Sequence, residues 1–511
     1  MSLRTLGALF AGEVLVTSST STSQRGALYV LDPSAPTHAP LLHWKGTTHA
    51  APHGLTCVPS ATGAAHDAGT SGLVAVIESD KAVLSLYSWQ RDQPVARIVL
   101  PQKMACMELS PDGHFLAAGS ADGRLYVWEV ATGALLSSFE AHYRALSVIR
   151  WTADAAALVT ASVDARICVW SVPDILLRTD LSGPMHPHNA APSPYAAFSD
   201  HTLAVTDLHV SSGPFPSSAR LWSASRDASV KLWDLRTRRL LSTFVFNEPI
   251  KQLAVDPLER FFFANTEPKE GARTLRVDLY VEDDGAWRVR GGRGAEGASE
   301  RIEDAPAVVL SEPVTAMALS HASSHVALGT LAGHVHLVDV TTLQTARTLH
   351  AGGTLAAGTA AAPTPVTNIR SLLRPVDLMG ALQLRGSGGK RSAALRDADA
   401  ASSAFVTPLP MRPVASQFAR TLVPPQDVPI VPLRVSAGAA HAAREVQAYL
   451  AGSHAPTASA PGAPTRGSAP VVDASALEAQ VHTLQAQLER AKALNDDMWQ
   501  HLVQSRAGAT T

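Results

Sequence analysis

Three segments of this chain share the same residue types at the same spacing, and this repeat constrains the fold more than any other feature. The segments read GSADGRLYVWEV, ASVDARICVWSV and ASRDASVKLWDL, and each has an Asp six residues before a Trp and a Ser two residues before that Asp. The shared positions are Ser120, Asp122 and Trp128, then Ser162, Asp164 and Trp170, then Ser225, Asp227 and Trp233. Such a period indicates an architecture in which similar units pack one against the next.

Each repeat predicts a set of short β-strands. Apolar residues such as Leu125 and Val127 alternate with other residues before the Trp, as a half-buried strand requires. Upstream, LSPDGHFLAAGS places Pro-Asp-Gly between two apolar runs and predicts a tight turn, and a fourth strand is expected at ATGALLSSF and RTRRLLSTF. Four short antiparallel strands in about 40–50 residues are typical of a propeller blade. The fold class is therefore predicted to be all-β.

This pattern resembles the WD-repeat family, whose blades hold a His, a Ser, an Asp and a Trp in a buried hydrogen-bonded chain. Two blades carry all four positions, namely His142, Ser162, Asp164 and Trp170, and His201, Ser225, Asp227 and Trp233. The indole N–H would donate to the hydroxyl, the hydroxyl to the imidazole, and the imidazole to the carboxylate. A hydrolase triad is the alternative, and it is disfavoured because the hydroxyls would be buried and no GxSxG turn is present.

The remaining blades are predicted to be degraded copies. VAVIESDKAVLSLYSW places Leu86 at the Trp position, VALGTLAGHVHLVDV places Val338 there, and segments beginning EVLVTSS and IKQLAVD supply a first and a sixth blade. The count predicts a seven-bladed WD-repeat β-propeller over residues 1–350, closed by strand exchange at the seam, with a packing extension to residue 378 as an option. Residues 183–198 and 283–306 are expected to be loop insertions.

Composition excludes several classes of protein. Charged residues make up 17% of the chain and the formal net charge is −2, which gives no global attraction to nucleic acid or an acidic membrane. Cys57, Cys106 and Cys168 lie far apart, which excludes a disulfide framework and favours a reducing compartment. The first residues do not favour a cleaved signal peptide, and no apolar run reaches the roughly 18 residues of a membrane span.

Other short motifs are expected to be loops or strand surface. GRGAEG at 292–297 matches a dinucleotide fingerprint but lacks a following apolar helix, and GSGGKRS at 386–392 departs from a P-loop. RTRRL is expected to be a solvated loop, with contact to RNA phosphates as the minority alternative. His334 and His336 alternate on one strand face, but the neighbouring sequence supplies no further Cys, Asp or His at suitable spacing. We therefore expect no metal and no cofactor.

The chain changes character after the propeller. Residues 379–472 are rich in Ala, Pro and Ser and are predicted to be a mostly disordered linker, with an apolar segment near 418–435 that lies along either the propeller or a partner. Residues 473–505 are predicted to form a coiled-coil helix and a homodimer, with a helix lying on its own propeller as the alternative. The seam has 4–3 spacing and consists of Leu477, Val481, Leu484, Leu488, Ala491, Asn495, Met498 and Leu502.

Two longer stretches are similar to the WD-repeat subunit of the Rix/Ipi pre-ribosome assembly complex. These are FEAHYRALSVIRWTADAAALVTASVDARICVWSV and FSDHTLAVTDLHVSSGPFPSSARLWSASRDASVKLWDL, in which AHY and DHTLAVTDLHVSSG are the most specific parts. The C-terminal heptads add to the likeness, which covers most of the chain. The long Ala/Pro-rich tail and the Gly-rich loop of the sixth blade depart from the family, so the partner contacts of the tail stay open.

The resemblance implies a non-catalytic scaffold in the nucleus, in the nucleolus or nucleoplasm. It implies Rix-type and Ipi-type partner subunits on pre-60S particles, removal of the second internal transcribed spacer during rRNA processing, and recruitment of an AAA-type remodelling ATPase. A link to DNA replication licensing is associated with fungal members, and direct RNA contact is left open. The alternatives are a WD-repeat adaptor in another assembly, such as a ubiquitin-ligase substrate receptor or a trafficking coat, and an enzyme that uses the central channel.

Overall fold

The computed structural model of the 511-residue chain divides into two units, residues 1–429 and 430–511. The structure describes parts of the first unit. They are residues 12–20, 28–35, 40–44, 46–47, 49–59, 71–177, 192–267, 272–283, 286–291, 298–350, 364–375, 378 and 414–420. The predicted coiled-coil helix and most of the predicted linker therefore lie outside the described residues.

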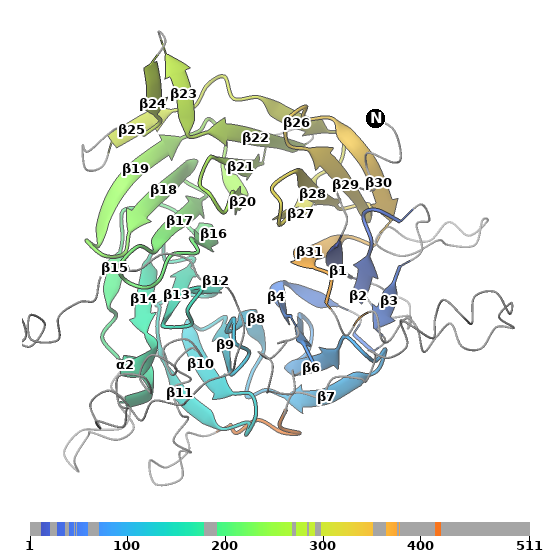
Figure 1. The fold of residues 1–511 in the computed structure, drawn as a ribbon. Coiled ribbons are helices and arrows are strands. Elements are labelled where there is room, and N and C mark those ends of the chain that lie inside the picture. The colour runs from blue at the N-terminus through green and yellow to red at the C-terminus, as the bar shows by residue number, and fades with distance from the viewer. Residues whose placement is uncertain are drawn as a thin grey trace, which may run out of the picture. The chain divides into compact units, whose positions relative to one another are not determined.

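Seven antiparallel sheets, which we call blades 1 to 7, are arranged around a ring (Figure 1). From the centre outward, blade 1 contains β31 (Val366–Leu373), β1 (Glu13–Ser19), β2 (Leu28–Leu31) and β3 (Leu42–Trp44). Blade 2 contains β4 (Ala50–Val58), β5 (Leu73–Glu78), β6 (Val83–Ser88) and β7 (Pro94–Val99). Blade 3 contains β8 (Met104–Leu109), β9 (Phe115–Ser120), β10 (Arg124–Glu129) and β11 (Leu135–Glu140).

The other four blades follow the same plan. Blade 4 contains β12 (Leu146–Trp151), β13 (Ala157–Ser162), β14 (Ile167–Ser171) and β15 (Ala196–Phe198), with the short helix α2 (Val172–Leu177) after β14. Blade 5 contains β16 (Val205–Val210), β17 (Arg220–Ser225), β18 (Ser229–Asp234) and β19 (Arg239–Val245). Blade 6 contains β20 (Ile250–Val255), β21 (Phe261–Thr266), β22 (Ala272–Asp278) and β26 (Ala307–Leu310). Blade 7 contains β27 (Val314–Leu319), β28 (His325–Thr330), β29 (His334–Asp339) and β30 (Thr345–His350). The seven-bladed prediction is thus confirmed.

The ring closes through a strand that lies beyond residue 350. β31 is the innermost strand of blade 1 and pairs antiparallel with β1, from Glu13 opposite Leu373 to Ser19 opposite Val366. The Asn368 side-chain amide donates to Ser18 Oγ at 2.9 Å, a residue 350 positions away, and to the Ala51 carbonyl oxygen of blade 2 at 2.7 Å. On the other side, Thr315 Oγ1 of blade 7 donates to the Val366 carbonyl oxygen at 2.6 Å. One strand therefore links blades 7, 1 and 2.

Parts of both predicted loop insertions are strands, which corrects that expectation. Residues 196–198 form β15, which pairs with β14 as the outer strand of blade 4. Within 283–306, β25 (Ala298–Arg301) pairs in parallel with β19 as a fifth strand of blade 5, and β23 (Tyr280–Asp283) and β24 (Ala286–Val289) form a separate hairpin. A strand at the edge of a sheet has unpaired backbone groups, and β15 and β25 satisfy those of β14 and β19.

The core lies between the blades. Trp222 of blade 5 and Phe262 of blade 6 are fully buried with ring centroids 5.4 Å apart, and Phe244 lies 5.3 Å from Phe262. Burial of a side chain of this size contributes about 1.5–3 kcal/mol, so each blade depends on its neighbour for stability. Among the described helices, none combines the length and hydropathy needed to cross a bilayer.

Closure of the ring by β31 predicts a difference between two substitutions on this strand. Ile369 is 5% exposed and packs against blade 7, whereas Leu373 at the end of the same strand is 54% exposed. Ile369→Asp should bury an unpaired carboxylate in the seam and lower the free energy of unfolding by about 3 kcal/mol or more. Leu373→Asp should change it by less than about 0.5 kcal/mol. Urea denaturation of the full chain measures both, and equal effects would contradict the assignment of β31 as a seam strand.

Candidate functional site

Blades 4 and 5 each contain a buried hydrogen-bonded network between a Trp, a hydroxyl, a His and an Asp. In blade 4, Trp170 Nε1 donates to Thr160 Oγ1 at 2.9 Å, Thr160 Oγ1 lies 2.9 Å from His142 Nε2, and His142 Nδ1 lies 3.2 Å from Asp164 Oδ2. Each network connects a Trp on the third strand of its blade to the loop that enters the blade.

Blade 5 repeats this geometry. Trp233 Nε1 donates to Ser223 Oγ at 2.9 Å, Ser223 Oγ lies 2.8 Å from His201 Nε2, and His201 Nδ1 lies 2.9 Å from Asp227 Oδ2. The His, Asp and Trp members are those that the sequence pattern selects. The hydroxyl members, Thr160 and Ser223, are not.

The predicted hydroxyls Ser162 and Ser225 have another role, because they sit at the ends of β13 and β17. Ser162 Oγ donates to the Arg144 carbonyl oxygen and accepts from the Asp164 backbone N–H, both at 3.1 Å. Ser225 Oγ makes the same two contacts in blade 5. The hydroxyl that reaches the indole stands two residues earlier on the same strand face, ten residues before the Trp. Both hydroxyls stand on that face, so only the folded blade shows which of them reaches the indole.

The two carboxylates hold the loops at one end of these blades. Asp227 accepts hydrogen bonds from the Thr202 and Ser229 backbone N–H groups at 3.0 Å each, and Asp164 accepts from Tyr143 and Arg166 at 3.1 and 2.9 Å. Burial acts to raise the pKa of Asp227, but hydrogen bonds from His201 and Ser229 outweigh it and hold the pKa below its usual range. The lowered pKa of Asp227 stabilises the folded state. This contribution is complete above the unfolded-state pKa of about 4, and it is lost as the pH falls from there toward the lower pKa of the folded state.

The ordered loops present an apolar and basic surface, which we call the loop face of blades 4 and 5. Tyr143 is 84% exposed, Leu203 is 53% exposed, and Val163 is also exposed. The Arg166 guanidinium lies 5.7 Å from the centre of the Tyr143 ring. Arg226, the residue before Asp227, is exposed. Large apolar side chains on rigid loops, accompanied by arginines, are typical of protein-binding surfaces.

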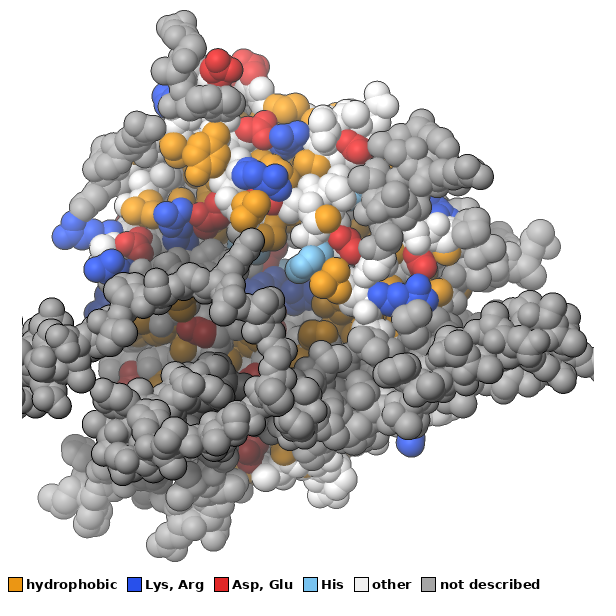
Figure 2. Space-filling model, in the orientation of Figure 1, with side chains coloured by type: hydrophobic (Ala, Val, Ile, Leu, Met, Phe, Trp, Pro, Cys, Tyr) orange, Lys and Arg blue, Asp and Glu red, His pale blue; other side chains and the backbone are white. Residues whose placement is uncertain are grey.

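Charge is mixed over the visible side of the propeller. Figure 2 shows Lys and Arg side chains interspersed with Asp and Glu over the described part of that side. This distribution agrees with the small net charge of −2. It does not resemble the continuous basic surface that nucleic-acid backbones require.

Blade 3 has the Ser, Asp and Trp of the repeat, yet Ser120, Asp122 and Trp128 form no such network. Ala118 occupies the hydroxyl position, so Trp128 Nε1 donates instead to the Ala419 carbonyl oxygen at 2.9 Å. Phe418 is buried with its ring 5.8 Å from the Trp128 ring. The Ala419 backbone N–H donates to the Gly133 carbonyl oxygen at 2.7 Å, and a Cβ at Gly133 would lie 2.2 Å from the Gln417 carbonyl oxygen. The start of the predicted apolar segment therefore packs on blade 3, and residues 421–435 lie outside the described residues.

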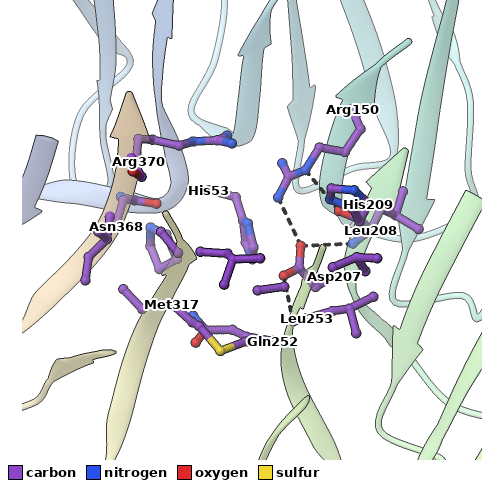
Figure 3. Close-up of a pocket in the computed structure, with 18 of the residues that line it drawn as sticks. His53, Arg150, Asp207, Leu208, His209, Gln252, Leu253, Met317, Asn368 and Arg370 are labelled. Atoms are coloured by element: carbon purple, nitrogen blue, oxygen red, sulfur yellow. Dashed lines mark hydrogen bonds and ion pairs between the residues drawn. The ribbon is translucent and has the colours of Figure 1, made fainter. Parts of the chain in front are cut away.

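The central channel contains a cavity of about 290 Å3 lined by the inner strands (Figure 3). Arg150 on β12 donates to Asp207 Oδ1 at 3.0 Å and to the Leu208 carbonyl oxygen at 3.0 Å. Glu108 on β8 lies 3.2 Å from Arg370 Nη2 and 3.9 Å from Arg150 Nη1. These charges are paired across blades 1, 3, 4 and 5, as buried charges must be. The channel arginines therefore connect inner strands of the ring.

Two histidines face the same channel. Burial lowers the pKa of His53 and of His209 to about 4, with a smaller opposing effect from Asp207. Both rings are consequently neutral at physiological pH. The described acids of the channel are held in ion pairs, an arrangement that supports a structural role for these residues.

The remaining predicted residues are placed as follows. Cys57, Cys106 and Cys168 are free thiols, and burial raises the pKa of each to about 12, so none is activated as a nucleophile. His334 and His336 lie on one face of β29, and the structure brings Glu312 to them, a residue that the sequence reasoning missed. Glu312 lies 22 residues before His334, and no local spacing indicates the contact.

Two family models match parts of the propeller. The anaphase-promoting complex subunit 4 WD40 domain matches residues 69–154, and the WD domain, G-beta repeat matches residues 192–234. Among curated proteins, the pre-rRNA-processing protein IPI3 of Mycosarcoma maydis is 36% identical over 98% of this chain and 97% of its own length. The protein of the same name from Yarrowia lipolytica is 32% identical over 58% of this chain and 63% of its own length. WD repeat-containing protein 18 of Homo sapiens is 30% identical over 58% of this chain and 62% of its own length.

The network geometry predicts that Ser223 contributes to stability through its hydroxyl alone. Ser223→Ala should leave the buried Trp233 N–H and His201 Nε2 without their partner and lower the free energy of unfolding by about 2 kcal/mol. Ser223→Thr should retain most of the stability, because Thr160 fills the equivalent position in blade 4. Chemical denaturation measures both variants. A Ser223→Ala protein as stable as the wild type would show that the network is energetically neutral.

Proposed function

The chain belongs to the IPI3 family of pre-rRNA-processing WD-repeat proteins, and we propose that it acts in this process as a non-catalytic scaffold subunit of a nuclear Rix/Ipi-type complex. The observation that carries the proposal is the 36% identity to the Mycosarcoma maydis protein across 98% of this chain. That match includes both the propeller and the C-terminal region. Proteins that share only a propeller would align over the blades alone.

The structure supports binding rather than chemistry as the basis of this function. The His, hydroxyl, Asp and Trp groups that could suggest a triad are buried in the networks of blades 4 and 5, away from any substrate. The described charges of the central channel are paired with one another. What the propeller offers to other molecules is its surface, including the loop face of blades 4 and 5.

The proposal extends to the family's assembly. Its partners are Rix-type and other Ipi-type subunits on precursors of the 60S ribosomal subunit, and its nuclear site is the nucleolus or nucleoplasm. The complex supports removal of the second internal transcribed spacer and recruits an AAA-type remodelling ATPase. A role in DNA replication licensing is a further part of the proposal. All of these rest on the family resemblance and not on contacts of the described residues.

We further propose that residues 473–505 form a homodimeric coiled coil. The seam begins at Leu477, ends at Leu502, and places Asn495 at a core position, where a single Asn fixes register. Two propellers joined in this way would bind a two-fold symmetric partner with higher avidity and no new contacts.

An adaptor in a ubiquitin-ligase assembly is the competing function. The match to the anaphase-promoting complex subunit 4 model is the observation in its favour, but it covers only residues 69–154, in blades 2 and 3. The likeness to the pre-rRNA-processing relative covers nearly the whole chain.

The role of the loop face can be tested by affinity purification of the tagged full chain. Wild type should recover large-subunit precursors and assembly factors. Tyr143→Ser combined with Leu203→Ser should reduce this recovery several-fold without loss of stability, because both side chains are exposed. The control is Leu258→Ser, which removes a 72% exposed side chain from the turn at the opposite end of the strands. Recovery of ubiquitin-ligase subunits in place of precursors would reject the proposed function, and equal recovery by both variants would reject the loop face.

The coiled coil is tested by two pairs of substitutions that add the same charge. Leu484→Glu with Leu488→Glu places charge in the seam and should convert a dimer into a monomer in analytical ultracentrifugation. Gln485→Glu with Gln487→Glu adds the same charge outside the seam and should leave the dimer intact. A wild-type chain that sediments as a monomer at micromolar concentration would contradict the proposal.

A further inference from the structure

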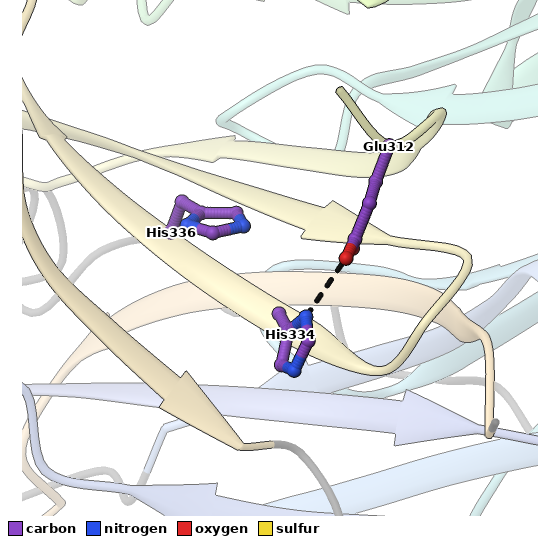
Figure 4. A group of neighbouring side chains, drawn as sticks. All are labelled: Glu312, His334 and His336. Carbon is purple, nitrogen blue, oxygen red and sulfur yellow. Dashed lines mark hydrogen bonds and ion pairs between the residues drawn. The ribbon is translucent and has the colours of Figure 1, made fainter. Parts of the chain in front are cut away.

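Blade 7 carries a group of ligand-forming side chains on β29 and in the turn before β27 (Figure 4). His334 and His336 stand two residues apart on β29 and so point to the same face, and Glu312 lies in the turn that leads into β27. One potential ligand atom from each side chain lies within 4.8 Å of the others. His334 Nδ1 lies 3.2 Å from Glu312 Oε2.

This group occupies a blade that lacks the Trp–hydroxyl–His–Asp network. In register with blades 4 and 5, Ala332 takes the Asp position, Val338 the Trp position and Leu328 the hydroxyl position. None of these three side chains can donate or accept a hydrogen bond. In blades 4 and 5 the network anchors the loop that enters the blade. In blade 7 the corresponding turn lies before β27, and its Glu312 contacts His334.

We propose that Glu312, His334 and His336 bind one divalent transition-metal ion, with Zn²⁺ as the best chemical match. Imidazole nitrogens and a carboxylate oxygen are common zinc ligands, and two His with one carboxylate leave a coordination position for water. The ion would join the turn before β27 to β29, and would replace in blade 7 the connection that hydrogen bonds supply in blades 4 and 5. This inference does not depend on the proposed role in pre-rRNA processing.

The surroundings of the three side chains suit an ion. The Thr348 hydroxyl lies 3.0 Å from His336 Nδ1, which orients the ring and leaves Nε2 for coordination.

The distances require only a small adjustment. Ligand bonds of about 2.0–2.2 Å in a tetrahedral site place the ligand atoms about 3.3 Å apart. In this structure the three ligand atoms lie within 4.8 Å of one another. Glu312 and His334 are half-exposed, so their side chains can rotate toward an ion without disturbing the core. The His350 ring, whose centre lies 5.0 Å from that of His334, is a neighbour and not one of the three proposed ligands.

The test uses the full chain, purified without a polyhistidine tag and treated with a chelator. Isothermal titration with Zn²⁺ should show one site per chain at micromolar concentration, and Co²⁺ should give the visible absorption of a coordinated ion. His334→Ala with His336→Ala should abolish this site, and Glu312→Gln should weaken it about tenfold or more. The matched control is His321→Ala, an exposed histidine in the turn between β27 and β28, which should bind as wild type does.

Thermal melting provides a second readout. Zn²⁺ should raise the Tm of the wild type and of His321→Ala, and should not raise that of the double His variant. If the double variant fails to fold, the affinity of Glu312→Gln decides. The proposal is overturned if the wild type takes up no Zn²⁺, or if Glu312→Gln and the double His variant bind it as tightly as the wild type.

Discussion

The pairing of β1 with β31 is the interaction on which the rest of this propeller depends. Each blade buries its large side chains against the next, so an open ring would expose two apolar blade faces to water. β31 prevents this by completing blade 1 from the C-terminal side, and its Asn368 and Val366 hydrogen-bond to blades 2 and 7. The inner-strand charges, such as Arg150 with Asp207, are paired only because the ring holds neighbouring blades at fixed positions.

Within the closed ring, the blades differ in the contacts that their third strands and entering loops make. A loop that enters a blade has to be attached to the strands beneath it, and blades 4 and 5 use a Trp, a hydroxyl, a His and an Asp. Blade 3 has Ala118 at the hydroxyl position, and its Trp128 binds the segment around Phe418 instead. Blade 7 has Ala332 at the Asp position and presents Glu312 and His334 at the corresponding end. Blades 3 and 7, which lack the network, therefore make other contacts in its place.

Rigid loops explain how such a ring can serve an assembly. Exposed side chains such as Tyr143 and Leu203 lose less conformational freedom on binding when their backbone is already ordered, and this lowers the cost of association. A propeller offers several separate surfaces to other molecules, at the two ends of its strands and along its outer edge. The segment at 414–420 shows that blade 3 accepts another part of the chain, with a buried aromatic residue, beside the turn between β10 and β11.

Features that repeat along the chain could be predicted from the sequence alone. The Ser–Asp–Trp spacing and the alternation of apolar residues predicted the β-strands, the blades and their number, because strand periodicity and turns are local properties. Pairings between distant residues were decided by the tertiary structure. β31 meets β1 across 350 residues, Thr160 rather than Ser162 reaches Trp170, and Glu312 meets His334, although no local pattern marks these partners. Two hydroxyls on one strand face look equivalent in a sequence, and only their distances to the indole in the folded blade distinguish them.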